Sequence, residues 1–167
     1  MIKLNVAEIK RRLVGKKTFA YDLSPEELEI TPADMDVVGT VRAEGCISNA
    51  GDVLLLEAEL SAQVRRTCGR CLKEFTAVTK ADVLEKFYPA SAENIEKDAF
   101  VYDSDIVDVT EPLRETLLLA EPIQALCKED CKGLCPVCGA DLNSGDCGCD
   151  RFSVDPRLAA LKQFIKN

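Results

Sequence analysis

The chain has 167 residues, 47% of them apolar, which suits a soluble protein of about one domain with a core of its own. Its formal net charge of −8 disfavours indiscriminate nucleic-acid binding, and the absence of histidine removes the usual catalytic base near neutral pH. No apolar run approaches the ~20 residues of a membrane helix, and the N-terminus lacks the apolar stretch of a secretory signal, so we expect a cytoplasmic protein.

Charge is unevenly spread along the chain. Residues 1–20 carry six basic side chains against one acid, Glu8, whereas the stretch from Asp82 to Glu115 is rich in acids. Residues 63–73 are basic without any acid and contain Arg65, Arg66, Arg70 and Lys73. Such runs are either solvated faces or, in the alternative interpretation, basic patches that touch phosphate and acidic faces that meet a basic partner.

The hydrophobic pattern predicts a short helix over residues 5–16 and an extended stretch over residues 19–23. Ser24 and Pro25 are typical of a capped helix start or of a turn. Alternating apolar residues then predict three strands: one from residue 37 to a turn at residues 49–52, one over 53–67 and one over 75–87. We expect these strands to form an antiparallel meander, with Cys68 and Cys71 at the hairpin between the second and the third.

The second half of the chain is expected to add helices. Residues 88–109 are polar and acidic, with one short strand near residues 100–102. A helix is expected to begin at Thr110 and to be stopped by Pro122, with its apolar stripe covering one face of the sheet. Asp155 and Pro156 indicate a terminal helix whose apolar stripe packs on its own domain or meets a partner.

The fold class is therefore α+β, an antiparallel β-sheet meander with flanking helices and a C-terminal zinc-knuckle segment. We expect an α+β core domain over residues 1–126, which carries the first cysteine pair. A cysteine-rich zinc-binding segment over residues 127–167 is expected to follow, with its terminal helix packed on the core.

Eight of the nine cysteines have metal-ligand spacing. A C-x2-C pair lets one turn of backbone direct two thiolates at a point about 2.3 Å from each sulfur, as a tetrahedral zinc ion requires. Closing the shortest loops first gives one site made of Cys135, Cys138, Cys147 and Cys149. The remaining four residues form a second site, Cys68, Cys71, Cys127 and Cys131. A rival partition pairs Cys68 and Cys71 with Cys135 and Cys138 as facing knuckles.

Zinc is the metal that we expect at these sites. Four-thiolate sites are closed, so no position is left for a reactive water and the role of the ion would be structural. Cys131-x3-Cys135-x2-Cys138 also has the spacing of iron–sulfur ligands in radical enzymes that use S-adenosylmethionine, but the chain is too small for the barrel of such enzymes. Cys46 lies outside every group and is expected to be a buried strand residue.

Several segments of the chain resemble the YceD family: Cys68-Gly-Arg-Cys71-Leu72, Glu121-Pro122-Ile123, Cys127 to Asn143, and Asp155-Pro156-Arg157-Leu158-Ala159. The likeness covers most of the chain and is most specific from Cys127 to Ala159. This family occurs in bacteria and plastids and is implicated in the accumulation or processing of large-subunit ribosomal RNA. The resemblance therefore implies a role in ribosome biogenesis, and it offers no catalytic residues to match.

The resulting hypothesis is a non-enzymatic zinc-binding factor that assists large-subunit ribosomal RNA accumulation or processing. Its expected partner is precursor large-subunit ribosomal RNA or a basic ribosomal protein, with no membrane and no small-molecule substrate. The RNA-facing residues would be Arg65, Arg66, Arg70 and Lys73. The alternatives are a redox-responsive zinc protein, or a metal-dependent RNA-processing enzyme in which Asp103, Asp105 and Asp108 would hold Mg²⁺.

Overall fold

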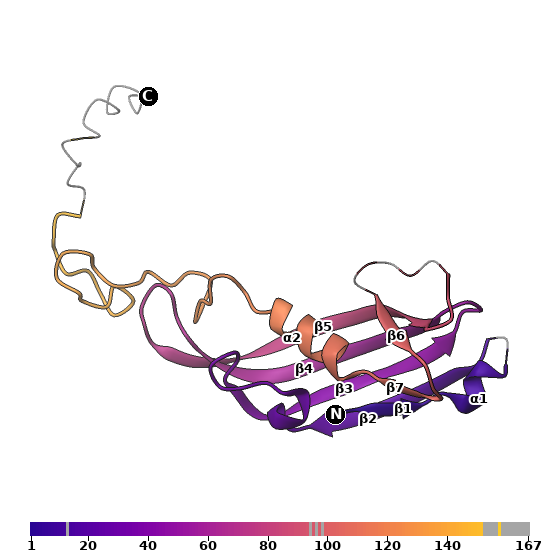
Figure 1. Cartoon of the computed structure of the whole chain (residues 1–167). Coiled ribbons are helices and arrows are strands. Elements are labelled where there is room, and N and C mark those ends of the chain that lie inside the picture. The colour runs from indigo at the N-terminus through magenta and orange to yellow at the C-terminus, as the bar shows by residue number, and fades with distance from the viewer. Residues whose placement is uncertain (13, 94, 96, 98, 152–156, 158–167) are drawn as a thin grey trace. The chain divides into compact units, whose positions relative to one another are not determined.

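The structure, a computed structural model, describes residues 1–12, 14–93, 95, 97, 99–151 and 157 (Figure 1). The chain divides into two compact units. Unit 1 comprises Met1–Arg66 and Phe75–Ile123, and unit 2 comprises Thr67–Glu74 and Gln124–Asn167. This division differs from the predicted boundary after residue 126, because the segment with the first cysteine pair groups with the C-terminal cysteines. The predicted terminal helix lies outside the described residues.

The elements follow in chain order as β1 (Lys3–Asn5), α1 (Ala7–Lys10), β2 (Lys16–Leu23), the 3-10 helix η1 (Pro25–Leu28), β3 (Val37–Asn49), β4 (Leu54–Thr67), β5 (Glu74–Pro89), β6 (Phe100–Tyr102), β7 (Ile106–Asp108) and α2 (Thr110–Leu119). Five strands form a sheet in the order β2-β3-β4-β5-β6. The β2–β3 and β3–β4 pairs are antiparallel, whereas β5 and β6 are parallel. A separate two-stranded sheet pairs β1 with β7. No helix among the described residues is long and apolar enough to span a membrane.

The predicted strands of the meander are present as β3, β4 and β5, and the extended stretch after residue 19 is part of β2. Two expectations are corrected. The sheet is mixed, because β6 joins it parallel to β5. The helix predicted over residues 5–16 is confined to Ala7–Lys10, and the residues before it form β1. β1 pairs with β7, about a hundred residues further along the chain, and no local pattern indicates such a partner.

Local chemistry fixes where two of the helices begin. Ser24 starts η1 with a capping box: its hydroxyl accepts from the Glu27 amide at 3.4 Å, and the Glu27 carboxylate accepts from the Ser24 amide at 2.8 Å. At α2, the Asp108 carboxylate accepts from the Thr110 amide at 3.0 Å. The Thr110 hydroxyl in turn accepts from the buried Ile2 amide at 2.6 Å, which ties the start of α2 to the N-terminal segment.

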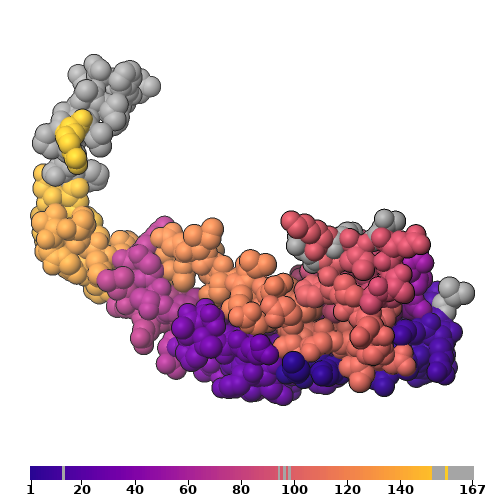
Figure 2. Space-filling model, viewed as in Figure 1, coloured from indigo at the N-terminus to yellow at the C-terminus, as the bar shows by residue number. Residues whose placement is uncertain are grey.

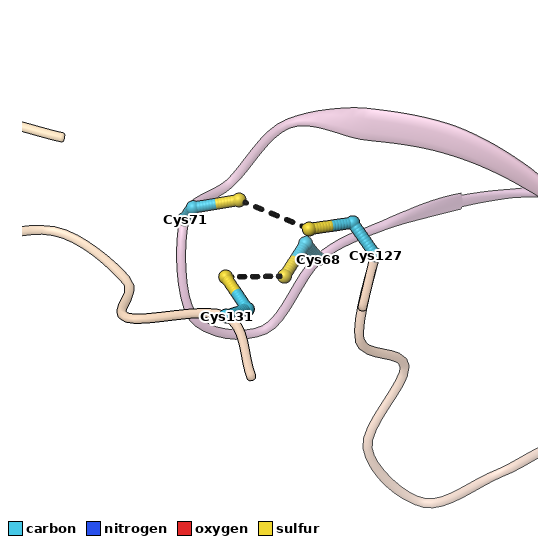
Figure 3. A group of neighbouring side chains, drawn as sticks. All are labelled: Cys68, Cys71, Cys127 and Cys131. Atoms are coloured by element: carbon cyan, nitrogen blue, oxygen red, sulfur yellow. Dashed lines mark hydrogen bonds between the residues drawn. The ribbon is translucent and has the colours of Figure 1, made fainter. Parts of the chain in front are cut away.

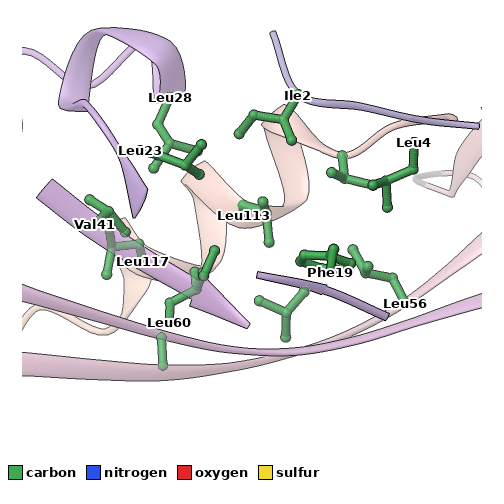
Figure 4. Packing of buried hydrophobic residues seen from close by; sticks show 14 of the residues in the cluster. Ile2, Leu4, Phe19, Leu23, Leu28, Val41, Leu56, Leu60, Leu113 and Leu117 are labelled. Carbon is green, nitrogen blue, oxygen red and sulfur yellow. The ribbon is translucent and has the colours of Figure 1, made fainter. Parts of the chain in front are cut away.

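The core of unit 1 lies between the five-stranded sheet and the layer that contains α2 (Figures 1 and 4). Alternation along β4 places Leu54, Leu56 and Leu60 inside, each at most 1% exposed. From α2, Leu113 and Leu117 meet them and are fully buried. Each such leucine stabilises the fold by about 1.5–3 kcal/mol relative to an exposed side chain. The hydrophobic core of unit 1 therefore contains none of the eight grouped cysteines.

Candidate metal centres

The first centre brings together the sulfurs of four cysteines, Cys68, Cys71, Cys127 and Cys131 (Figure 3). All four sulfurs lie within 4.8 Å of one another. The Cys68–Cys131 sulfurs are 3.8 Å apart, and those of Cys71 and Cys127 are 3.7 Å apart. A tetrahedral zinc ion with four sulfurs at about 2.3 Å separates them by about 3.8 Å, so these two distances match opposite edges of a zinc–thiolate tetrahedron.

The loop that joins β4 to β5 positions two of these ligands. Its turn is closed by hydrogen bonds from the Cys68 amide to the Lys73 carbonyl and from the Leu72 amide to the Cys68 carbonyl, both of 2.9 Å. Leu72 takes a left-handed conformation with φ of 59°, which lets the chain reverse right after Cys71. The Gly69 amide donates to the Ala125 carbonyl at 2.9 Å and so fixes the approach of the segment that carries Cys127.

The surroundings of the first centre favour thiolate at some positions and oppose it at others. Backbone amides of Cys127 and Cys71 donate to the Cys68 sulfur and lower the pKa of its thiol to about 6. Burial raises the pKa of the Cys127 thiol to about 12, and hydrogen bonds with Cys71 and Cys68 act in the same direction. Four thiolates this close repel one another unless a cation shares their charge. The donor set therefore fits a divalent, thiophilic ion. The side-chain amide of Asn143 donates to the Cys131 sulfur at 3.5 Å, a hydrogen bond of the kind that orients a metal ligand.

The second centre consists of Cys135, Cys138, Cys147 and Cys149, whose sulfurs also lie within 4.8 Å of one another. Its first turn is closed by the Gly139 amide, which donates to the Cys135 carbonyl at 2.9 Å. Amides of Cys138 and Val137 lower the pKa of the Cys135 thiol to about 6. Hydrogen bonds with Cys138 and Cys147 raise the pKa of Cys149 to about 12. Cys138 is exposed, so this centre is more open to solvent than the first.

The two groups of four are the ones that the cysteine spacing favours, and Cys68 and Cys71 do not share a group with Cys135 and Cys138. Cys131 belongs to one group and Cys135 to the other, so the three-cysteine iron–sulfur spacing is not gathered at one point. Cys46 is 6% exposed in β3 and lies outside both groups, as expected. That the eight sulfurs bind metal stays a prediction.

Two of the basic residues predicted to face RNA connect the loops of unit 2. The Arg70 guanidinium donates to the Cys131 carbonyl at 2.9 Å, and the Arg70 carbonyl accepts from the Leu134 amide at 3.1 Å. Lys73 pairs with Asp141 at 2.6 Å and holds the pKa of that carboxyl well below its usual range. Gly133 has φ of 74° and passes so close that an added Cβ would lie 2.9 Å from the Arg70 carbonyl oxygen. Arg70 and Lys73 therefore link the turn that carries Cys68 and Cys71 to residues 131–141.

The other two predicted RNA-facing residues lie in unit 1. The Arg66 side chain is only 10% exposed and binds both carboxylate oxygens of Glu121, at 3.0 and 2.5 Å. It also donates to the Thr79 hydroxyl. Arg65 is exposed and lies 3.7 Å from Asp36. Each of the four basic side chains thus has a partner within the protein. Nothing in the sequence indicated Glu121 as the partner of Arg66, because it lies more than fifty residues after Arg66.

The sequence of the chain is similar to a protein family and to several known proteins. Residues 56–165, which include all eight grouped cysteines, match the family described as "Large ribosomal RNA subunit accumulation protein YceD". Uncharacterized protein YlbN of Bacillus subtilis is 28% identical over 155 residues, which cover 90% of either chain. Uncharacterized protein Mb2951c of Mycobacterium bovis is 31% identical over 124 residues, which are 71% of this chain and 59% of that relative.

A plant relative carries the family's function in its name. The "Large ribosomal RNA subunit accumulation protein YCED homolog 1, chloroplastic" of Arabidopsis thaliana is 39% identical over 55 residues, 33% of this chain and 17% of that protein. No solved structure matches the chain. Since the family match covers well over half of its length, the chain belongs to the YceD family.

Proposed function

We propose that this protein is a non-enzymatic factor that supports the accumulation of large-subunit ribosomal RNA and is stapled by two zinc ions. The observation that carries the proposal is the family match over residues 56–165, a segment that contains both sulfur groups. The family's description names accumulation of that RNA and no reaction.

Zinc in these centres would act as a cross-link. Cys68, Cys71, Cys127 and Cys131 would hold one ion, and Cys135, Cys138, Cys147 and Cys149 the other. When bound, each ion supplies structural energy, because four thiolates complete its coordination and leave no open position for a water or substrate. The centres therefore support a scaffold, and they argue against hydrolysis at the metal.

The proposed partner is a component of the assembling large subunit, either precursor ribosomal RNA or a basic ribosomal protein. The chloroplastic plant relative supports a compartment with ribosomes of bacterial type, which in a bacterium is the cytoplasm. Of the four basic residues, we assign Arg66 to the fold, because its guanidinium is enclosed by Glu121 and Thr79. Arg65, Arg70 and Lys73 are exposed and remain proposed RNA contacts.

The test is a deletion of the gene in its own organism, with the ratio of large- to small-subunit ribosomal RNA as the readout. We expect the ratio to fall and to be restored by the intact gene, with the small-subunit RNA as internal control. An unchanged ratio would contradict the proposed function. Elemental analysis of freshly purified protein should give two zinc ions per chain, whereas bound iron or Mg²⁺-dependent RNA cleavage would favour an enzyme.

A further inference from the structure

We propose that a basic hollow at the end of α1 binds the phosphate backbone of RNA, an inference that rests on the proposed function and assigns it a contact surface. A cavity of about 230 Å³ opens in unit 1 between α1 and the start of β2. Arg12, Lys16 and Lys17 line it together with Asn5 and Glu8. In Figure 2 the indigo atoms of this N-terminal segment lie on the surface of unit 1.

The hollow keeps a positive charge after its internal pairs are considered. Lys10 does not contribute, because its ammonium is 2.8 Å from the Asp105 carboxylate. The Lys17 ammonium donates to the Asn5 carbonyl at 2.9 Å, which orients the charge without neutralising it. Arg12 and Glu8 approach to 3.3 Å, but their side chains are 71% and 78% exposed, so the pair is weak. Three cations therefore face one carboxylate in the lining, and the exposed Arg11 lies next to them.

Asn49 binds backbone groups at the end of α1 and at Gly15, next to the hollow. Its side-chain amide donates to the carbonyls of Ile9 and Arg12, both at 3.1 Å, and its backbone amide donates to the Gly15 carbonyl at 2.8 Å. Gly15 packs so tightly that an added Cβ would lie 2.7 Å from the Ile9 carbonyl oxygen. These backbone acceptors are turned toward Asn49, so they do not compete with a ligand for the cations. Holding these backbone groups in place also lowers the entropy lost on binding.

Phosphodiester is the ligand chemistry that this hollow fits best. Its volume is below the range of about 300–1,000 Å³ that is usual for pockets that enclose a small molecule. Lysine and arginine side chains at exposed positions bind phosphate oxygens by charge-assisted hydrogen bonds. An anionic membrane is less suitable, because α1 has four residues and cannot form the amphipathic helix that binds at a bilayer surface. The net charge of −8 limits attraction to short range, so binding should be weak and sensitive to salt.

The experiment uses the full-length, metal-loaded protein and a fluorescein-labelled oligouridylate of about 20 nucleotides, titrated by fluorescence anisotropy at about 50 and 150 mM salt. Arg12→Gln/Lys16→Gln should weaken binding about tenfold at the lower salt and flatten the salt dependence, since each lost phosphate contact removes about 0.7 from its slope. The matched control, Lys80→Gln/Lys86→Gln, removes the same charge from β5 and should change affinity less than about twofold.

Glu8→Gln gives a test in the opposite direction. Removing this carboxylate frees Arg12 and raises the local positive charge, so RNA affinity should rise about two- to fivefold. A role of the loop in folding alone would not predict a gain. Equal RNA affinity of the wild type, Arg12→Gln/Lys16→Gln and the control would overturn the proposal. The proposal would also be overturned if Arg12→Gln/Lys16→Gln bound RNA as the wild type does but lost binding to phosphatidylserine vesicles, because the hollow would then be a membrane contact.

Complementation of the deletion strain separates this proposal from the proposed function. If the deletion lowers large-subunit RNA but Arg12→Gln/Lys16→Gln restores it fully, the hollow is not the contact surface and the proposed function stands. If the deletion leaves the RNA ratio unchanged, the proposed function fails whatever the binding data show. We expect the deletion to lower the ratio, the control variant to restore it and the hollow variant to restore it only in part.

Discussion

Arg66 shows at the scale of one residue how burial decides between two roles for a basic side chain. The sequence places it in a run of cations beside Cys68, which favours phosphate binding. In the fold its guanidinium is enclosed and shares the Glu121 carboxylate with Thr79. An enclosed charge costs several kcal/mol to desolvate, and its partner is what makes the position tolerable. Arg66 therefore belongs to the packing of β4 against the end of α2.

Arg66→Met tests this assignment. The variant leaves the Glu121 carboxylate without its cation, so we expect the free energy of unfolding to fall by about 2–3 kcal/mol, below the usual 3–5 kcal/mol for broken buried pairs because Glu121 is partly exposed. Urea denaturation followed by circular dichroism measures it. The neighbouring Arg65→Met is the control and should cost less than about 1 kcal/mol, because its pair with Asp36 is exposed. Equal losses for the two variants would contradict the buried role.

At the scale of elements, local patterns predicted the strands well and distant pairings poorly. Alternation along β4 identified its buried face, because a strand exposes successive side chains on opposite sides. The β1–β7 ladder could not be predicted, since its partners lie about a hundred residues apart in the chain. The parallel pairing of β6 with β5 could not be predicted either, since alternation within a strand of three residues does not specify the direction in which it pairs. The apolar residues near α1 have helical spacing, but Asn49 and the tight approach at Gly15 turn the chain away.

The cysteine groups were the part of the candidate site that spacing could predict. The C-x2-C pair and the short loop after Cys138 bring the sulfurs of the second centre together by local geometry, and the four cysteines that remain form the first centre. The contacts around the two centres could not be predicted. The hydrogen bond from Arg70 to the Cys131 carbonyl and the ion pair of Lys73 with Asp141 join loops that are distant in sequence. For the same reason the sequence did not show that Arg70 and Lys73 have partners within the protein.

A pair of cysteine variants tests the first centre. Cys127→Ser removes one of four ligands, so we expect the zinc content to fall from two ions to about one per chain. Amide exchange in residues 67–74 and 124–134 should then become fast, while β3 and β4 keep their protection. Cys46→Ser is the matched control, since Cys46 lies outside both groups, and it should keep both ions. Loss of zinc from the control, or full zinc content in Cys127→Ser, would count against the assigned ligands.

At the scale of the whole molecule, we expect apolar burial to stabilise unit 1 and metal binding to stabilise unit 2. The hydrophobic core cluster draws its residues from unit 1. In the described part of unit 2, Leu142 is the one buried apolar side chain besides the cysteines. So small an apolar content cannot offset the entropy of ordering the loops. Metal binding can, because structural zinc contributes about 10–16 kcal/mol in small zinc domains.

Removal of metal should therefore unfold unit 2 and leave unit 1 folded. With a strong chelator present, we expect proteolysis to become rapid between residues 124 and 151, while residues 16–66 stay protected and the β-sheet signal in circular dichroism remains. RNA binding at the basic hollow should also survive chelation, because Asn49 holds the Arg12 carbonyl and the β2–β3 ladder holds Lys16, with no part played by the sulfur groups. Added zinc should restore the protection of unit 2. Loss of the sheet together with the metal would show that the ions stabilise the entire chain, and the division of stability between core and metal would be wrong.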